Sequence, residues 1–599
     1  MIPASVNEPT RRRLMTTLTA APLMVALANK ARAAVASRTG LAVRTAPGLA
    51  TWPSDQEWAA LKTAVGGRLE PVALPPLDAA AATADFANQF WLRDQPAYTQ
   101  LSGWAGAWRS APSAYVVKAA SAGDVSAAVR FARARRLRLV VRGGGHSYLG
   151  GSNAPGSLLI WMRPMDQIAI HEAFVPAGSQ ATPVPAVSLG GGCIWLHAYE
   201  AVTGGAGRYV QGGGCTTVGV GGHVQGGGFG SFSKRYGLAS ASLLEAEVVT
   251  ADGVVRCVNA SQEPELFWAI KGGGGGTFGV VTRFTLATHE LPATFGAARW
   301  SVQAHSDGAY QRLLQRFLEV YAANLFNDHW GEQVHARGDN RLEVEMVFQD
   351  LDSATARAAW DPLVSFVRDH PDDYQARAPF LALSLPARMF WNADFLSSHA
   401  PGATTRDSRP GAKPGDFWWT GDGEQAAATV TAYASTWLPA SLLRADGPAR
   451  LARAWFQASR HRGVSLHLNK GLAGGSAQAL AASRDTSMNP EVLGAFALAI
   501  TGAMDATSYA PFQGPDLASA QAAADATAKA DQALRKAAPG AGSYVSECDY
   551  FMPDWQARAW GVHYPRLARI KRRYDPDGLF TVHHGVGSEG WSDDGFRRT

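Results

Sequence analysis

Short apolar runs separated by turns begin near Ala111, a pattern typical of strands joined by helices. AYVVKAAS predicts a strand, AGDVSAAVRFARARR predicts an amphipathic helix, and RLRLVVRGG predicts a buried strand that ends in glycines. Asp252-Gly253 supplies the turn of an expected hairpin. Strands, including that hairpin, are expected over 157–162, 186–191 and 244–258. Together these elements predict an α+β domain over 111–291.

The pattern changes after residue 291. RLEVEMVFQD predicts a strand at 341–350, and an Ala-rich run predicts a helix around 516–537. PGATTRDSRPGAKPGD, at 401–416, is rich in Pro and Gly and predicts an exposed loop. Strand, helix and strand are expected near the end of the chain, around YVSECDYF and YPRLARIKRRYDP. We therefore expect five segments, 1–36, 37–110, 111–291, 292–540 and 541–599.

Glycine is the unusual feature of the composition. The chain has 63 glycines in 599 residues, concentrated between Gly143 and Gly279 in runs such as GGG, GGGC and GGGGG. No repeat of about 20–50 residues accompanies them, which excludes a solenoid. Clustered glycine among strands indicates backbone that approaches something closely or adopts positive φ. The hydrophobic content of 46% and charged content of 18% otherwise describe an ordinary globular chain.

Charge and cysteine spacing exclude several function classes. Apart from RRR at 11–13 and KRR at 571–573, the cations behind the net charge of +5 are interleaved with acids, so no basic stripe for nucleic acid is present. The four cysteines lack CxxC spacing and indicate neither a zinc site nor a disulfide framework. His583 and His584 would point to opposite faces of a strand, so we expect no metal site there.

The N-terminus has the pattern of a targeting segment. TRRRLM carries paired arginines, and the apolar run from Leu14 to Asn29 is shorter than the about 20 residues that span a membrane. Small-residue cleavage sites lie between Ala33 and Ala36. The pattern resembles a bacterial twin-arginine signal, which implies a periplasmic or secreted protein, export by the twin-arginine (Tat) machinery and no stable membrane insertion. An uncleaved basic tail is the alternative.

RGGGHS, at 142–147, is the first of three glycine-rich runs. Backbone N–H groups in such a loop can bind phosphate, but this one is neither a P-loop nor a dinucleotide-binding GxGxxG. By itself it leaves a nucleotide site and a structural turn equally open. QGGGCTTVGVGGHVQGGGFGSFSKRYGL at 211–238 and ELFWAIKGGGGGTFGVVT at 265–282 follow it, and together the three favour a nucleotide site.

The three runs, in this order and spacing, resemble the FAD-linked oxidases with a PCMH-type (vanillyl-alcohol oxidase-like) fold, in the berberine bridge enzyme-like branch. VHHGVGSEGW, near the end of the chain, is similar to an isoamyl alcohol oxidase-like subgroup. The resemblance covers about 111–291 and 541–585, with a looser fit between them. It implies an α+β fold in which residues 37–110 form an extension packed on the FAD domain and 111–291 form the PCMH-type FAD-binding domain. Residues 292–540 would form a substrate domain with an antiparallel sheet, and 541–599 a berberine-type segment that completes the FAD domain.

The family attaches its flavin to the protein through the histidine of RGGGHS, which implies covalent FAD at His146. A second bond, from a cysteine to flavin C6, lies in the family motif CPTVGVGGH. Here CTTVGVGGH keeps Cys215 and has Thr216 in place of the proline. Cys193 also follows three glycines but matches a structural turn. The other FAD contacts that the resemblance implies are Arg142, Gly143, Gly144, Gly145, Ser147, Gly219, Gly221, Gly222, His223, Gly226, Gly227, Gly228 and Val281.

YVSECD resembles the family's YxNYxD motif, in which a tyrosine commonly serves as the base. Here Glu547 replaces the second tyrosine, so the resemblance implies Tyr544 or Glu547 as base, and a buried structural role for either stays open. His223 is expected near flavin N1–C2=O, where a donor would stabilise the charge of the reduced flavin. SLHLNKGLAGG alternates like a strand, which would place His467 and Asn469 together as substrate contacts. Lys470, on the other face, is as readily a surface charge.

The activity that the resemblance implies is oxidation of an alcohol or sugar-like small molecule. Hydride would pass from a C–OH carbon to flavin N5, and O₂ would be reduced to H₂O₂. Val218 stands where the family's oxygen gate lies, and valine there favours an oxidase. The alternatives are a dehydrogenase with a non-oxygen acceptor and a non-catalytic secreted FAD-binding protein.

Overall fold

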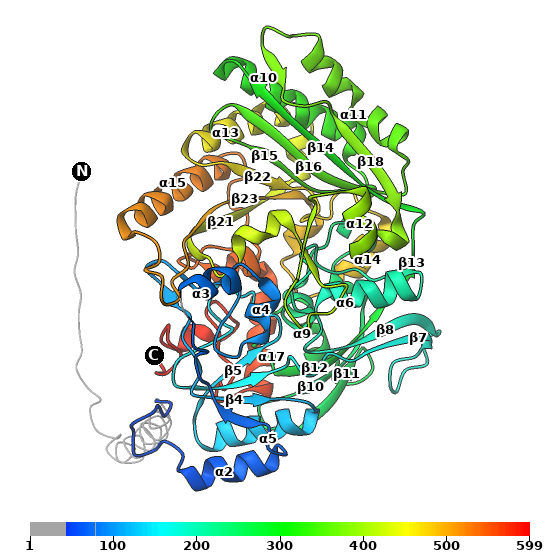
Figure 1. The fold of residues 1–599 in the computed structure, drawn as a ribbon. Helices are drawn as coiled ribbons and strands as arrows, with labels where there is room; N and C mark the ends of the chain where they lie inside the picture. The colour runs from blue at the N-terminus through cyan, green and yellow to red at the C-terminus, as the bar shows by residue number, and fades with distance from the viewer. Residues whose placement is uncertain (1–42, 78) are drawn as a thin grey trace, which may run out of the picture.

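The structure is a computed structural model that describes residues 43–77 and 79–599. The predicted signal at 1–36, with its cleavage site between Ala33 and Ala36, lies outside the described residues. Two smaller sheets form the lower half of the view in Figure 1, and a large sheet with its helices forms the upper half. The predicted strands at 157–162 and 186–191 and the hairpin at 244–258 are confirmed.

The first small sheet contains the strand that leads into RGGGHS. Its four strands are, in order across the sheet, β1 (Leu69–Pro71), β4 (Tyr115–Lys118), β6 (Ser157–Trp161) and β5 (Arg138–Arg142). The last three are parallel, as expected of strands linked by a helix. That helix, α5 (Ala122–Ala134), begins with a capping box, in which the Ser121 hydroxyl accepts from the N–H of Asp124 and the Asp124 carboxylate accepts from the N–H of Ser121.

The second small sheet is antiparallel and carries the strand that follows the third glycine run. Its order is β11 (Val255–Asn259), β10 (Leu243–Val249), β12 (Val280–Ala287), β8 (Val184–Gly190) and β7 (Ile168–Phe174). The C-terminal helix α17 (Tyr564–Tyr574) packs against α9 (Pro264–Ile270), so the end of the chain returns to the half formed by the two smaller sheets. The other short elements of this half are α2 (Asp55–Ala64), α6 (Trp195–Tyr199), α7 (Val220–Gln225), α8 (Ser233–Tyr236), β9 (Arg208–Tyr209), β13 (His289–Glu290) and α16 (Trp555–Trp560).

The large sheet has ten strands and forms the expected antiparallel domain. Its path is β17 (Tyr374–Ala376), β14 (Thr294–Ala304), β16 (Arg341–Gln349), β15 (Trp330–Ala336), β22 (Val464–His467), β23 (Ala495–Asp505), β21 (Thr429–Pro439), β2 (Gly103–Trp104) and β3 (Trp108–Arg109), with β18 (Leu381–Pro386) beside β14. Figure 1 shows its long helices, α10 (Asp307–Val320), α11 (Ser353–Arg368), α13 (Gly447–His461) and α15 (Leu517–Arg535). Around it lie α12 (Ala393–His399), α14 (Ala477–Arg484), β19 (Thr404–Arg406) and β20 (Phe417–Trp419).

The N-terminal extension pairs with the first small sheet and also with the large sheet. β1 pairs with β4 of the first small sheet, and β2 pairs in parallel with β21 of the large sheet. Between these strands lie α3 (Ala79–Phe86) and α4 (Gln89–Asp94). Asn88 caps α4 by accepting from the N–H groups of Phe90 and Trp91, so the first residue of the helix, Gln89, has a fixed place.

Two local predictions are wrong. YVSECDYF is no strand: residues Val545–Glu547 form a 3₁₀ turn. Side-chain bonds from β21, such as the Ser435 hydroxyl to the Glu547 carbonyl, hold this segment in place of a β-ladder. The loop at 401–416 is not exposed throughout, because Asp407 and Asp416 are buried. Asp416 accepts from His197 at 2.8 Å, which ties the loop to α6.

Candidate active site

Two of the glycine-rich runs touch through their backbones. A Cβ on Gly144 would lie 2.5 Å from the nitrogen of Gly219, and a Cβ on Gly219 would lie 2.5 Å from the nitrogen of Gly144. Such distances are far inside van der Waals contact, so neither position tolerates a side chain. The loop after β5 and the loop before α7 are therefore pressed together, which brings the segments of His146 and Cys215 side by side.

His146 lies in the first of these loops and bonds to the second. Its Nε2 is 3.0 Å from the hydroxyl oxygen of Thr217. Loss of water around the ring lowers the pKa of His146 to about 4. The imidazole is therefore neutral near pH 7 and keeps a nitrogen lone pair.

Cys215 lies in the second loop and faces Asp422, on the turn after β20. Burial, and next the carboxylate of Asp422, raise the pKa of the Cys215 thiol. Burial also raises the pKa of Asp422 to about 6. Its Oδ2 is buried, and among the described residues it has no hydrogen-bond partner. A carboxyl with this pKa can take or give a proton near neutral pH.

A partly buried ion pair closes the other side of the cluster. The ammonium of Lys470 lies 2.6 and 2.7 Å from the two carboxylate oxygens of Glu547. The Lys470 side chain is only 14% exposed, so it is no surface charge. Asn469 and Lys470 follow the end of β22 in a turn, which is why the strand alternation predicted from the sequence does not apply to them. Burial, and next the carboxylate of Glu547, raise the pKa values of Tyr148 and Tyr433, so these phenols stay protonated and line the same region as donors.

The remaining predicted catalytic and substrate residues lie at the edges of this cluster. Tyr544 is buried, and burial raises the pKa of its phenol further above the usual value of 10, which disfavours the phenolate. Asn469 donates to the carbonyl of Gly230 at 3.2 Å, with Glu332 close by at 3.5 Å. The His467 ring bonds to Ser465 at 3.1 Å, and burial lowers its pKa well below 6.5.

Two predicted cofactor contacts are used differently from what the resemblance implies. Arg142 donates to the carbonyls of Tyr98 and Gln95, at 2.5 and 3.0 Å, so its guanidinium holds the N-terminal extension against the first loop, and its contact with FAD stays a prediction. His223 gives its Nε2 hydrogen to the carbonyl of Phe229 at 2.9 Å, since a carbonyl can only accept. With its pKa lowered to about 4 by burial, His223 presents Nδ1 as an acceptor and has no second hydrogen to donate.

The loops nevertheless fit a large polar cofactor such as FAD. In the described part of the chain, four buried polar atoms of the glycine-rich runs have no partner: Thr216 Oγ1, His223 Nδ1, Gln225 Oε1 and Thr277 Oγ1. Buried polar atoms in proteins are nearly always hydrogen-bonded, so these are suited to a ligand. A Cβ on Gly222 would meet nothing within 4 Å, and a Cβ on Gly275 would meet Gly222 Cα at 3.3 Å, so bare backbone faces this space. Residues of these loops would hold the dinucleotide.

The other predicted FAD contacts keep their places in these loops. Gly145, Gly227 and Gly228 have positive φ of 83°, 99° and 76°, which explains glycine there. Ser147 accepts from the N–H of Gly151 at 3.0 Å and shapes the first loop. The remaining positions are backbone of the two touching loops, the helix α7 and the start of β12: Gly143, Gly221, Gly226 and Val281.

Sequence reasoning missed several residues of the site. Gln89, Thr217, Glu332 and Asp422 come from four segments that are distant in the sequence, and none of them lies in a position that the family motifs mark as chemical. Thr217 alone had a signal, because it lies within CTTVGVGGH.

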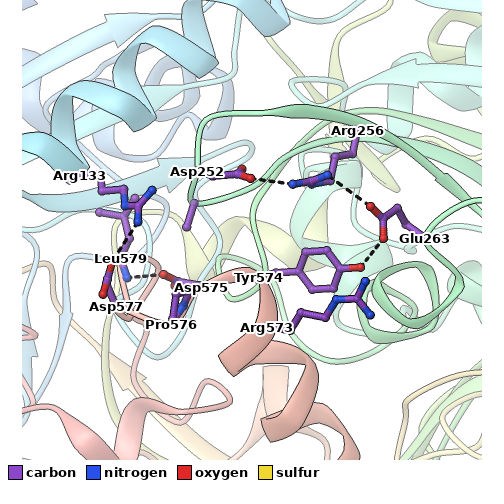
Figure 2. Close-up of a pocket in the computed structure, with 11 residues that line it drawn as sticks. Arg133, Asp252, Arg256, Glu263, Arg573, Tyr574, Asp575, Pro576, Asp577 and Leu579 are labelled. Atoms are coloured by element: carbon purple, nitrogen blue, oxygen red, sulfur yellow. Dashed lines mark hydrogen bonds and ion pairs between the residues drawn. The ribbon is translucent and has the colours of Figure 1, made fainter.

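A cavity of about 270 Å³ between α5, β11 and the end of α17 is not this site (Figure 2). None of the predicted site residues lines it. Its charges pair with one another: Arg256 bonds Asp252 at 2.6 Å, and Arg133 bonds Asp577 at 3.2 Å.

The prediction for the histidine pair rested on a wrong element. His583 and His584 lie in a turn, not a strand, and their rings are 4.1 Å apart. Within residues 43–77 and 79–599, no three His, Cys, Asp or Glu side chains gather as a metal site. No helix in the same part of the chain is long and apolar enough to cross a membrane.

Two family models match separate stretches of the chain. The FAD binding domain model matches residues 112–258, and the model described as berberine and berberine like matches residues 543–587. A FAD-linked oxidoreductase of Malbranchea aurantiaca is 30% identical over 583 residues, which cover 91% of this chain and 92% of the relative. A VAO-type flavoprotein oxidase of Thermothelomyces thermophilus is 29% identical over 602 residues, covering 92% and 94%.

Solved structures share the fold. A VAO-type flavoprotein from Myceliophthora thermophila C1 superposes with a TM-score of 0.74 at 24% identity, covering 93% of this chain and all of the other. Glucooligosaccharide oxidase from Acremonium strictum superposes with a TM-score of 0.64 at 17% identity, covering 88% and 99%.

The sequence relatives also correct the predicted location. They include enzymes of Malbranchea, Aspergillus, Gibberella and Thermothelomyces, which are fungi. The prediction of a bacterial protein exported through a twin-arginine signal is therefore wrong, and secretion is not shown. The identity and coverage of these relatives, together with the two family models and the fold, decide the class: the chain belongs to the vanillyl-alcohol oxidase and berberine bridge enzyme-like family and is a FAD-dependent oxidoreductase.

Proposed function

We propose that the chain is an oxidase that takes hydride from a C–OH carbon of a hydroxyl-rich small molecule and passes the electrons to O₂. Its FAD would be attached through both His146 and Cys215. The observation that carries the proposal is the backbone contact between Gly144 and Gly219, because it holds the two attachment residues on adjoining loops. Two neighbours with this fold support it by name: a chitooligosaccharide oxidase, and a glucooligosaccharide oxidase with 6-S-cysteinyl, 8α-N1-histidyl FAD.

FAD would supply the hydride acceptor, and the protein would supply the base. Of the carboxylates in the cluster, Asp422 suits that task best. Its Oδ2 has no partner among the described residues, and its pKa of about 6 lets it take the hydroxyl proton of a substrate near neutral pH. Both oxygens of Glu547 are already bonded to Lys470, and Tyr544 holds its phenol proton.

We assign the other polar groups to binding and orientation of the substrate. The Lys470–Glu547 pair and the amide of Asn469 present charged and polar groups toward hydroxyls, and Tyr148 and Tyr433 add donors. A cluster of this kind suits a substrate with several hydroxyl groups more than an apolar alcohol, because each buried polar group needs a partner. His467 ends β22, just before this turn, and would shape the site.

Peptide mapping of the denatured protein tests the attachment. Flavin that bridges the peptides of His146 and Cys215 is the expected result, with one bond lost in each of the variants His146→Ala and Cys215→Ala. Protein that is folded and expressed with ample riboflavin but holds no covalent flavin would overturn this part.

Turnover is tested separately. Oligosaccharides and polyols are screened aerobically for H₂O₂, and the reduced enzyme is mixed with O₂ in a stopped-flow instrument. Fast reoxidation is expected of an oxidase. Substrate reduction of the flavin followed by slow reoxidation would instead assign a dehydrogenase, and no reduction by any hydroxylated substrate would contradict the proposed activity.

A further inference from the structure

A chain of buried hydrogen bonds runs behind His146. The Nε2 of His146 is 3.0 Å from Thr217 Oγ1, which donates to Gln89 Oε1 at 2.6 Å. The Nε2 of Gln89 donates to the backbone carbonyl of Asp422 at 2.8 Å. Thr217 is fully buried and Gln89 is 3% exposed. The chain therefore joins α4, both cofactor loops and the turn that carries Asp422.

The direction of each bond follows from what the atoms can do. A backbone carbonyl only accepts, so the amide NH₂ of Gln89 faces Asp422 and its oxygen faces Thr217. That oxygen also only accepts, so the hydroxyl hydrogen of Thr217 points to Gln89. Thr217 then has only lone pairs left for His146, and the hydrogen between them belongs to Nε2 of the imidazole.

The ring has only one hydrogen to place. Because the pKa of His146 is lowered to about 4, the imidazole is neutral near pH 7. A hydrogen fixed on Nε2 leaves Nδ1 with its lone pair.

We propose that Thr217 and Gln89 are positioning residues for covalent attachment of the flavin, which hold the hydrogen of His146 on Nε2 so that Nδ1 is the nucleophile. The inference rests on the proposed attachment of FAD at His146. In the net reaction, a bond forms between Nδ1 and the 8α carbon, and one C–H bond of that methyl group breaks. The 8α proton and the Nε2 proton leave to water, and the two electrons pass to the isoalloxazine and then to O₂, which becomes H₂O₂.

The test uses Cys215→Ala as the parent, because its flavin can be bonded only through His146. Each variant is purified with FAD, incubated with excess FAD in air, and sampled for acid-precipitable flavin over time. Thr217→Val, which keeps the side-chain shape and removes the hydroxyl, is expected to slow attachment about tenfold, the factor that corresponds to about 1.4 kcal/mol and the scale of one buried hydrogen bond. Thr217→Ser is expected to restore the parent rate.

Thr203→Val is the matched control. Thr203 is as buried as Thr217, its hydroxyl has no partner in the described chain, and it lies outside the three glycine-rich runs, so loss of its hydroxyl should leave the attachment rate unchanged. Gln89→Leu gives an independent test of the proposal if Thr217→Val fails to fold. Without the amide oxygen, the hydroxyl of Thr217 can donate to Nε2, which moves the ring hydrogen to Nδ1 and slows attachment by a similar factor.

NMR of the isolated flavin–histidine conjugate identifies the bonded nitrogen, and Nδ1 is expected. Attachment of Thr217→Val and Gln89→Leu at the parent rate, or a parent bonded through Nε2, would overturn the inference. A parent that carries no covalent flavin would instead refute the proposed attachment at His146, so the two failures are distinguishable.

Discussion

Asp422→Asn is expected to make the protein more stable and less active at the same time. The substitution keeps the size and shape of the side chain but removes its charge and its capacity to accept a proton. Burial raises the pKa of Asp422 from 3.8 to about 6. At about 1.4 kcal/mol for each pH unit, that difference corresponds to about 3 kcal/mol by which the site disfavours the ionised carboxylate.

The sign of the pH dependence follows from proton binding. The folded protein binds this proton more tightly than the unfolded chain does, so stability from the protonated carboxyl is complete below about pH 4 and is lost as the pH rises through about 6. Asparagine does not titrate. The free energy of unfolding of Asp422→Asn should therefore exceed that of the parent by up to about 3 kcal/mol at pH 7 and match it near pH 4.

Urea unfolding at the two pH values measures this, and steady-state kinetics measures the loss of the base. A drop of about 10²–10⁴ in kcat is expected, the usual contribution of a general base. Asp407→Asn is the control and should lower the stability at pH 7 instead of raising it, because Asp407 bonds Arg409 and Asn88 and its pKa lies below the usual value. A variant Asp422→Asn that gains no stability at pH 7 would refute the pKa argument, and one that keeps its kcat would refute the role as base.

Three further predictions use the same site. Gly144→Ala should abolish covalent flavin, since its Cβ would lie 2.5 Å from the backbone nitrogen of Gly219. The control Gly204→Ala, whose Cβ would meet nothing within 4 Å, should retain flavin fully. The flavin absorbance of the denatured protein measures the covalent flavin in each variant. Lys470→Met leaves the carboxylate of Glu547 unpaired and should lower the free energy of unfolding by about 2–3 kcal/mol. The double variant with Glu547→Gln should recover more than half of that loss, because the unpaired charge is removed. An equal loss of stability in the single and the double variant would contradict a coupled pair. Flavin attachment should have the same rate from pH 6 to 8, because the pKa of His146 is about 4; a rate that falls below pH 7 would show an imidazole that is not depressed.

Hydrogen-bond direction assigns the same tautomer to two histidines that the sequence presents alike. His146 and His223 each follow glycines and each has a pKa lowered to about 4. His146 bonds the hydroxyl of Thr217, which already donates its hydrogen to Gln89 and can only accept, and His223 bonds the carbonyl of Phe229, which also only accepts. Both rings therefore carry their hydrogen on Nε2, and each offers a bare Nδ1. In the proposed enzyme one of these atoms attacks the flavin, and the other can accept a hydrogen bond.

The sequence by itself determined the elements whose cause is local. Ser121 and Asp124 start α5, an Asp-Gly turn closes the β10–β11 hairpin, and clustered glycines indicate close backbone approach. The resemblance carried by the three glycine-rich runs supplied the family and the cofactor, because these motifs are contiguous. Local patterning failed at 544–551, where bonds to β21 rather than the segment's own alternation decide the backbone.

Only the tertiary structure decided which side chains share the site. Gln89 begins a helix in the N-terminal extension, Asp422 lies in a turn of the large-sheet half, and Lys470 follows a strand, yet all three reach the loops of His146 and Cys215. Burial then set the protonation of each group: it lowered the pKa of His146 and raised that of Asp422. Desolvation and hydrogen-bond direction depend on neighbours that are hundreds of residues apart, and no window of sequence contains them.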